Sequence, residues 1–245
     1  MPSEGTQITY PPAAIANIAM IRRVAEKLGV SLRERVTFVG GATTVLLLTD
    51  VKPPDIRSTQ DVDVVVEVVG YSSYAHLGEQ LRERGFQEGG GPVICRWRVD
   101  GITVDIMPTD ETILGFTNRW YTEVVATAQP AALPILADEE QALKILLVTP
   151  LCFVATKIEA FLGRGNGDYY MSHDLEDIVT VVNGRAELVK EIGHDAVSLF
   201  VSQTFAKWLA VPEFPDALEG HLSEQGRYGI VWERFRAIAA RHGGG

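Results

Sequence analysis

Two aspartates separated by one residue, Asp61 and Asp63, lead into the apolar run 64–66. In a β-strand, side chains two residues apart project from the same face, so both carboxylates face one way and Val62 and Val64 the other. Two neighbouring carboxylates repel each other, and removing them from water is costly unless a cation compensates. Divalent cations such as Mg²⁺ prefer oxygen ligands. The pattern therefore predicts a Mg²⁺ site, with Mn²⁺ as an alternative ion.

A third aspartate and a pair of glycines extend this pattern. Asp105 lies in the apolar stretch 102–107, and if the sheet brings the two strands together, three carboxylates can hold two metal ions. Upstream, the apolar stretch 36–39 ends at Gly40 and Gly41, where backbone N–H groups can approach a phosphate closely. A glycine turn for phosphate beside carboxylates for Mg²⁺ is the equipment for phosphoryl or nucleotidyl transfer, with an NTP as substrate.

The elements that must position these residues follow from the periodicity of the apolar residues. Helices are expected at 13–28 (ending at Gly29), 74–84, 149–162, 172–182, 186–192, 196–209 and 230–241. Strands are expected at 36–39, 61–66, 93–99, 102–107, 133–137 and 143–148, with Asp100-Gly101 as a two-residue hairpin turn. Residues 142–147 are alternatively helical. We therefore expect an α/β (α+β) fold. A mixed sheet flanked by helices would occupy residues 1–148, and a C-terminal helical domain residues 149–245.

Together these motifs resemble the nucleotidyltransferase (DNA polymerase β-like) superfamily, whose pattern is GG or GS, then DxD, then a third Asp on a separate strand. More narrowly, the run RSTQDVD at 57–63 resembles the R-x-T-x-D-x-D run of the AbiEii/AbiGii-type toxins, which include the MenT-like enzymes. The later segment PLCFVATKIEAFLGR and the following SHDLEDI are similar to that group's helix with a Lys and an Arg and its [KH]-D-x-x-D segment. The matching positions there are Lys157, Arg164, Asp174 and Asp177, and the resemblance covers most of residues 36–185.

The resemblance implies transfer of a nucleoside monophosphate from an NTP to an acceptor hydroxyl. It implies catalytic and metal-binding roles for Asp61, Asp63 and Asp105, the last nearer the acceptor, where it would favour deprotonation of the hydroxyl. The nucleotide-binding residues would be Gly40, Gly41, Thr43, Thr59, Lys157 and Arg164, supported by Arg57, Asp174 and Asp177. It also implies a toxin of a type IV-like toxin–antitoxin or phage-defence system, with an antitoxin protein encoded nearby as partner. In MenT-like relatives the acceptor is the 3′ end of tRNA.

Other interpretations stay open at this point. The same metal site would serve a small-molecule or protein nucleotidyltransferase, antibiotic-modifying or AMPylating, or the fold could persist as a non-catalytic binding module. Lys157 either snorkels to solvent from an apolar helix or binds triphosphate. Asp174 and Asp177 are expected to form ion pairs with Arg164 or Lys157 in a supporting role rather than to act in catalysis.

The composition limits the partners and the compartment. The chain has 245 residues, and its 22 Lys and Arg against 32 Asp and Glu give a net charge of −10. This acidity argues against broad electrostatic binding to nucleic acid, although a basic strip of Arg22, Arg23, Arg33 and Arg35 could contact phosphates. The polar N-terminus lacks a secretory signal, no apolar run reaches membrane-spanning length, and Cys95 and Cys152 are expected to be buried thiols. We expect a cytoplasmic protein without membrane partners.

Overall fold

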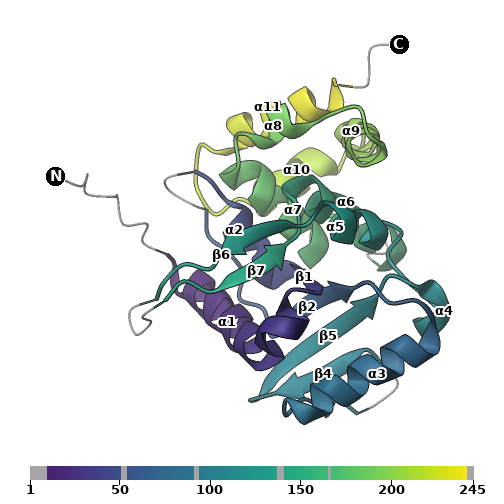
Figure 1. Ribbon diagram of the computed structural model, residues 1–245. Coiled ribbons are helices and arrows are strands. Elements are labelled where there is room, and N and C mark those ends of the chain that lie inside the picture. Colours follow the sequence, from purple (N-terminus) through teal and green to yellow (C-terminus); the bar gives the residue numbers. More distant parts are fainter. Residues whose placement is uncertain (1–9, 51–53, 91–93, 137–140, 165–166, 242–245) are drawn as a thin grey trace.

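The computed structural model describes residues 10–50, 54–90, 94–136, 141–164 and 167–241. Within these ranges the fold is mixed α/β, and a seven-stranded sheet with flanking helices is followed by a helical region at the C-terminus (Figure 1). The strand order is β3-β4-β5-β2-β1-β7-β6. The strands are β1 (Val36–Val39), β2 (Asp61–Val66), β3 (Gln87–Glu88), β4 (Arg96–Val99), β5 (Ile102–Pro108), β6 (Gln129–Ala132) and β7 (Lys144–Leu147). The predicted fold class is confirmed.

The sheet is mixed because β2 pairs with β5, and β1 with β7, in parallel, whereas the other neighbouring strands are antiparallel. The hairpin between β4 and β5 turns at Asp100-Gly101, as predicted. Asp100 has φ 49° and Gly101 φ 82°, the positive values of a type I′ turn, whose twist matches that of the flanking strands. The two-residue turn fixes the register, so Val99 pairs with Ile102 and Arg96 with Asp105.

Most predicted helices are present, with shifted ends. The helices are α1 (Pro12–Arg33), the 3-10 helix η1 (Gly41–Thr43), α2 (Thr44–Leu47), α3 (Gly70–Glu83), α4 (Glu111–Leu114), α5 (Tyr121–Thr127), α6 (Pro150–Arg164), α7 (His173–Gly184), α8 (Leu188–Glu191), α9 (Ala196–Leu209), α10 (Phe214–Gly220) and α11 (Tyr228–Ala239). Gly29 interrupts α1 with φ 66°, at the predicted helix end, and one further turn follows it. The cap of α7 is Ser172, whose hydroxyl accepts from the N–H of Leu175.

One predicted strand needs correction, and three short helices were missed. The predicted strand 133–137 is wrong, because the strand that pairs with β7 is β6, which contains Pro130 and lies at the sheet edge, where a missing N–H is tolerated. Ala137 and Val93, the predicted ends of two strands, lie outside the described residues. The short helices α4, α5 and α10 were missed, since four to seven residues give too few turns for a periodic signal.

The main hydrophobic core runs across the predicted domain boundary at residue 148. It includes Phe38 and Val64 from the sheet and Phe153, Phe205 and Phe235 from the C-terminal helices. Helix α6 packs against α7 and α9, and α11 packs against α7 and α9. The α6–α7 pair therefore shares one core with the sheet, which holds these two helices in a fixed position beside its strands.

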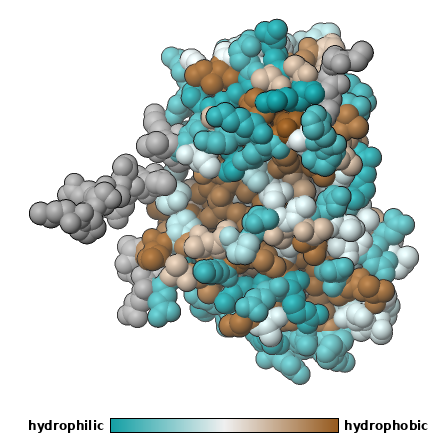
Figure 2. Space-filling view, turned by 45° about the horizontal axis from the view of Figure 1, so that its top comes forward, coloured by the Kyte–Doolittle hydropathy of each residue, from teal (hydrophilic) through white to brown (hydrophobic). Residues whose placement is uncertain are grey.

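The surface and the cysteines agree with the composition. Figure 2 shows hydrophilic residues over most of one face, with hydrophobic residues gathered mainly across its middle. Cys95 and Cys152 are both free and buried, as predicted. Among the described helices, none combines the length and the apolar character that spanning a membrane requires.

Candidate functional site

The carboxylates predicted to bind metal lie on adjacent strands and share one face of the sheet. Strand β2 has half-buried Asp61 and Asp63 alternating with buried Val62 and Val64, so the aspartates point away from the hydrophobic core. Asp63 is the register partner of Asp105 on the parallel strand β5. The sequence showed only that Asp61 and Asp63 share a face, and the strand order places Asp105 beside them.

The glycine turn lies directly against the side chains of Asp63 and Arg57. Gly40 has φ 75°, which L side chains rarely adopt, and a Cβ placed there would stand 1.9 Å from Oδ2 of Asp63. A Cβ on Gly41 would stand 2.3 Å from Nη2 of Arg57. Both glycines are therefore required by the close approach of site side chains.

Asp63 lies in an environment that disfavours its charge. Burial, the charge of Asp61 and, less strongly, that of Asp105 raise the pKa of Asp63 to about 7, against the opposing effect of Lys157. A carboxylate in this situation is stabilised by a cation placed between it and its neighbour. Asp61 and Asp63 are thus chemically suited to a Mg²⁺ ion, which commonly binds proteins through one or two carboxylates and takes its remaining ligands from substrate phosphates and water.

Asp105 does not fit the predicted role of a free third ligand. Nε of Arg96 donates to its Oδ1 at 2.8 Å and Nη2 donates to its Oδ2 at 2.7 Å, so both carboxylate oxygens are engaged. This hydrogen-bonded pairing raises the pKa of the Arg96 guanidinium further above its usual value. In the described part of the chain, no group of three or more Asp, Glu, His or Cys residues is placed to hold a metal ion. The expected three-carboxylate metal site is therefore not preformed.

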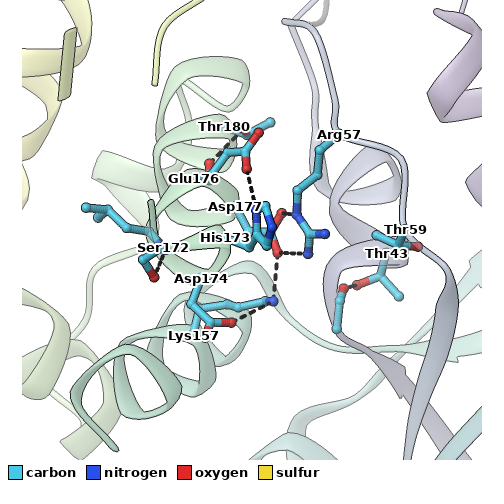
Figure 3. Close-up of polar contacts among 12 residues, drawn as sticks. Thr43, Arg57, Thr59, Lys157, Ser172, His173, Asp174, Glu176, Asp177 and Thr180 are labelled. Carbon is cyan, nitrogen blue, oxygen red and sulfur yellow. Dashed lines mark hydrogen bonds and ion pairs between the residues drawn. The ribbon is translucent and has the colours of Figure 1, made fainter. Parts of the chain in front are cut away.

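A buried ion-pair network connects α6 and α7 to the loop before β2 (Figure 3). Lys157 lies in the core, so the snorkelling interpretation is wrong, and its Nζ contacts Asp177 Oδ2 at 2.7 Å and Asp174 Oδ1 at 3.1 Å. Arg57 donates two hydrogen bonds of 2.9 Å to Asp177. Arg164 donates to both oxygens of Asp174 and leaves most of its side chain in solvent. The supporting ion pairs predicted for Asp174 and Asp177 are confirmed.

The pKa shifts in this network show that pairing outweighs burial. Burial alone would raise the pKa of Asp177, but Lys157 and Arg57 hold it below its usual value. Burial would likewise raise the pKa of Asp174, but Lys157 and Arg164 lower it. Burial would lower the pKa of Lys157, but the two carboxylates raise it. All these groups therefore stay charged near neutral pH.

Two threonines predicted to bind nucleotide lie beneath the site instead. Thr43 is buried and its hydroxyl donates to the carbonyl of Gly40 at 2.8 Å, so it holds the glycine turn and has no hydrogen left for a phosphate. Thr59 is buried as well, and its hydroxyl donates to the carbonyl of Asp61 at 3.2 Å. The Thr43 hydroxyl, expected to contact phosphate, instead has a structural role in holding the glycine turn.

Asn17 of α1 and Arg96 of β4 are site residues that sequence reasoning missed. Nδ2 of the buried Asn17 donates to the carbonyl of Arg57 at 3.1 Å, and its Oδ1 accepts from the N–H of Thr59 at 3.2 Å. No local signal marks Asn17, because its partners are about forty positions away in sequence. Arg96 could have been found, because the Asp100-Gly101 turn alone places it opposite Asp105.

Two adjoining cavities open over these residues. One of about 480 Å³ is polar and one of about 610 Å³ also has apolar lining, sizes typical of sites for small ligands. Both are lined by Asp63, Arg96, Asp105, Lys157, Arg164 and Asp174. Gly41, Arg57, Asp61 and Ser172 line only the first, and Gly40, Cys95, Phe116 and Tyr121 only the second. Asp63 and Asp105 therefore lie where a cavity lined by charged side chains of both signs meets a more apolar pocket.

The basic strip predicted on the surface lacks one of its four members, Arg22. Arg22 is buried, and its guanidinium donates to the carbonyls of Pro134 and Gln141. Arg23 pairs with Asp100.

Compared with known proteins, the chain matches no protein-family model and no curated protein.

Proposed function

We propose that the chain is a cytoplasmic, Mg²⁺-dependent nucleotidyltransferase that moves a nucleoside monophosphate from an NTP to an acceptor hydroxyl. The observation that carries this proposal is that Asp61, Asp63, Gly41 and Lys157 line one cavity, while Gly40 lies against Asp63 in the adjoining one. A carboxylate pair suited to a divalent cation thus lies beside groups suited to phosphate. The resemblance of the same motifs to the nucleotidyltransferase superfamily supports it.

The residues of the cleft have separate tasks in this reaction. Asp61 and Asp63 would hold Mg²⁺, which when bound offsets the negative charge of the phosphates and stabilises the attacking and leaving oxygens. The turn at Gly40 and Gly41 lets the chain approach the triphosphate without a side chain in between. Lys157 and Arg164, held by Asp174, offset the charge of the pyrophosphate that leaves. The acceptor oxygen bonds to the α-phosphorus, the bond to the β-phosphate oxygen breaks, and the hydroxyl proton is released to water.

The resemblance of residues 57–63 and of the later Lys and Asp positions to the AbiEii/AbiGii-type toxins supports a biological setting. We propose that the enzyme acts as a toxin restrained by a partner protein, with the 3′ end of tRNA as the first acceptor to test. In that case, expression of the wild-type chain arrests growth and expression of the Asp63→Asn variant does not. Growth arrest by both variants would separate toxicity from the proposed chemistry.

The activity test uses each α-labelled NTP with Mg²⁺ and total tRNA. Wild type, Asp63→Asn and Asp61→Asn are compared with Asp216→Asn, which removes an exposed carboxylate from α10, on a helix that does not line the cleft. Label on tRNA with the wild type and Asp216→Asn alone supports the proposal and identifies the acceptor. Label on the protein itself indicates AMPylation-type chemistry. Absence of both label and Mg²⁺-dependent NTP binding contradicts the catalytic proposal and favours a binding module.

A further inference from the structure

Arg96 is held at the edge of the catalytic cleft with part of its guanidinium unused. Its bonds to Asp105 take the Nε–H and one N–H of Nη2, whereas a guanidinium has five N–H donors. The side chain of Arg96 is 38% exposed, and that of Asp105 only 14%. The carboxylate is therefore the buried, fixed member of the pair, and the arginine presents its remaining donors to the cavities that it lines.

The strand register places Arg96 on the far side of the carboxylates from the phosphate turn. Val39, Asp63, Asp105 and Arg96 form one row across β1, β2, β5 and β4. Gly40 follows Val39 at one end of the row, and Arg96 stands at the other. Because neighbouring strands lie about 4.8 Å apart, the backbone at Arg96 is roughly 10 Å from that at Asp63. An NTP bound over Gly40 and Asp63 thus leaves the Arg96 end of the row for the acceptor.

We propose that Arg96 binds an anionic group of the acceptor, and that Asp105 is the residue that positions Arg96 rather than a metal ligand. This inference rests on the proposed nucleotidyl transfer, which defines the acceptor side. A guanidinium fixed by a carboxylate presents planar N–H donors that match the oxygens of a phosphate. The acceptor class is therefore a molecule with a phosphate near the reacting hydroxyl, such as a nucleic-acid end or a sugar phosphate. A cationic acceptor such as an aminoglycoside is disfavoured by the same charge.

The test measures binding of paired probes, one of which carries a charged phosphate and the other of which does not. The full chain with Mg²⁺ is titrated with a dinucleoside monophosphate and with its uncharged methylphosphonate analogue, and separately with glucose 6-phosphate and glucose. Arg96→Gln is compared with Arg98→Gln, which removes the same charge from the same strand at an exposed position that lines none of the described cavities. We expect Arg96→Gln to lower the affinity for the phosphate-bearing probe by about tenfold or more, and Arg98→Gln to lower it by less than about twofold.

The comparison of probes distinguishes a binding role from loss of structure. Loss of affinity confined to a charged probe supports the inference, and whichever phosphate probe binds more tightly identifies the source of the phosphate. Equal weakening of the charged and uncharged probes, no effect of Arg96→Gln, or no binding of either phosphate probe by the wild type would overturn it. Arg96→Lys should restore part of the affinity, because it returns the charge but not the paired donors.

Two further measurements keep this inference separate from the proposed function. Mg²⁺-dependent NTP affinity should change less than about twofold in Arg96→Gln, since the triphosphate is placed at the other end of the row. A loss of NTP affinity there would make Arg96 a nucleotide ligand and refute the acceptor role. If Arg96→Gln unfolds because Asp105 is left unpaired, the double variant Arg96→Gln/Asp105→Asn removes that charge and repeats the test. Wild-type protein that binds the phosphate probe but no NTP would contradict the nucleotidyltransferase proposal, while the binding role of Arg96 would still be decided by the probes.

Discussion

Replacing Asp177 by Asn should destabilise the protein far more than an exposed carboxylate does. The Asp177 side chain is 2% exposed and accepts two bonds of 2.9 Å from Arg57 and one contact of 2.7 Å from Lys157. Asparagine keeps the shape but leaves Arg57 without its carboxylate and Lys157 with Asp174 alone. Removing one partner of a buried pair leaves an uncompensated charge, so we expect a loss of about 3–5 kcal/mol in the free energy of unfolding.

Urea unfolding followed by circular dichroism at pH 7, in EDTA, measures this loss. The matched control is Glu176→Gln, one residue earlier on α7, which removes a carboxylate whose partner is the exposed His173 and should cost less than about 1 kcal/mol. The double variant Asp177→Asn/Lys157→Met should cost less than the sum of the two single variants by about 1–3 kcal/mol, because the two charges compensate each other. A cost for Asp177→Asn no larger than that of the control, or strict additivity, would refute the reasoning.

The same carboxylate gives the pH dependence a definite sign. The pKa of Asp177 is lowered in the folded protein, so its contribution to stability is present above its unfolded pKa of about 3.9 and is lost as pH falls through the folded value. Asp177→Asn should therefore flatten the fall in stability of the wild type between about pH 4 and pH 2. The raised pKa of Lys157 acts at the opposite end, with a contribution complete below about pH 10.4 and lost at still higher pH. An unchanged acid slope in the variant would contradict this assignment.

Three further predictions concern the cleft. Because the pKa of Asp63 is raised to about 7, ionisation of this carboxyl lowers the free energy of unfolding as pH rises from about 4 to 7. In EDTA, Asp63→Asn should therefore be up to about 4 kcal/mol more stable than wild type at pH 8 and equally stable at pH 4. Gly40→Ala should abolish Mg²⁺-dependent NTP binding, measured by calorimetry, whereas Gly85→Ala, which has a positive φ but open space, should retain it. Asn17→Ala should lower the thermal midpoint and weaken NTP binding through displacement of Arg57, and unchanged NTP affinity would contradict its positioning role.

The hairpin shows how much of the site local sequence can specify. Asp100-Gly101 predicts a two-residue type I′ turn, and such a turn fixes which residues face each other on both strands. The pairing of Arg96 with Asp105 follows by counting back from the turn. That pairing could have been predicted from the sequence, and it would have shown that the carboxylate of Asp105 is already paired with the guanidinium of Arg96.

Sequence by itself determined the elements whose information is local: the α/β fold class, the bounds of α9, the cap of α7 and the common face of Asp61 and Asp63. Each depends on residues a few positions apart, where backbone geometry alone relates the side chains. Tertiary structure alone decided that β5 lies beside β2, that Lys157 is buried between two carboxylates, and that Asn17 binds the loop before β2. These contacts join distant parts of the chain, and their geometry depends on the packing of the whole core, which no local pattern encodes.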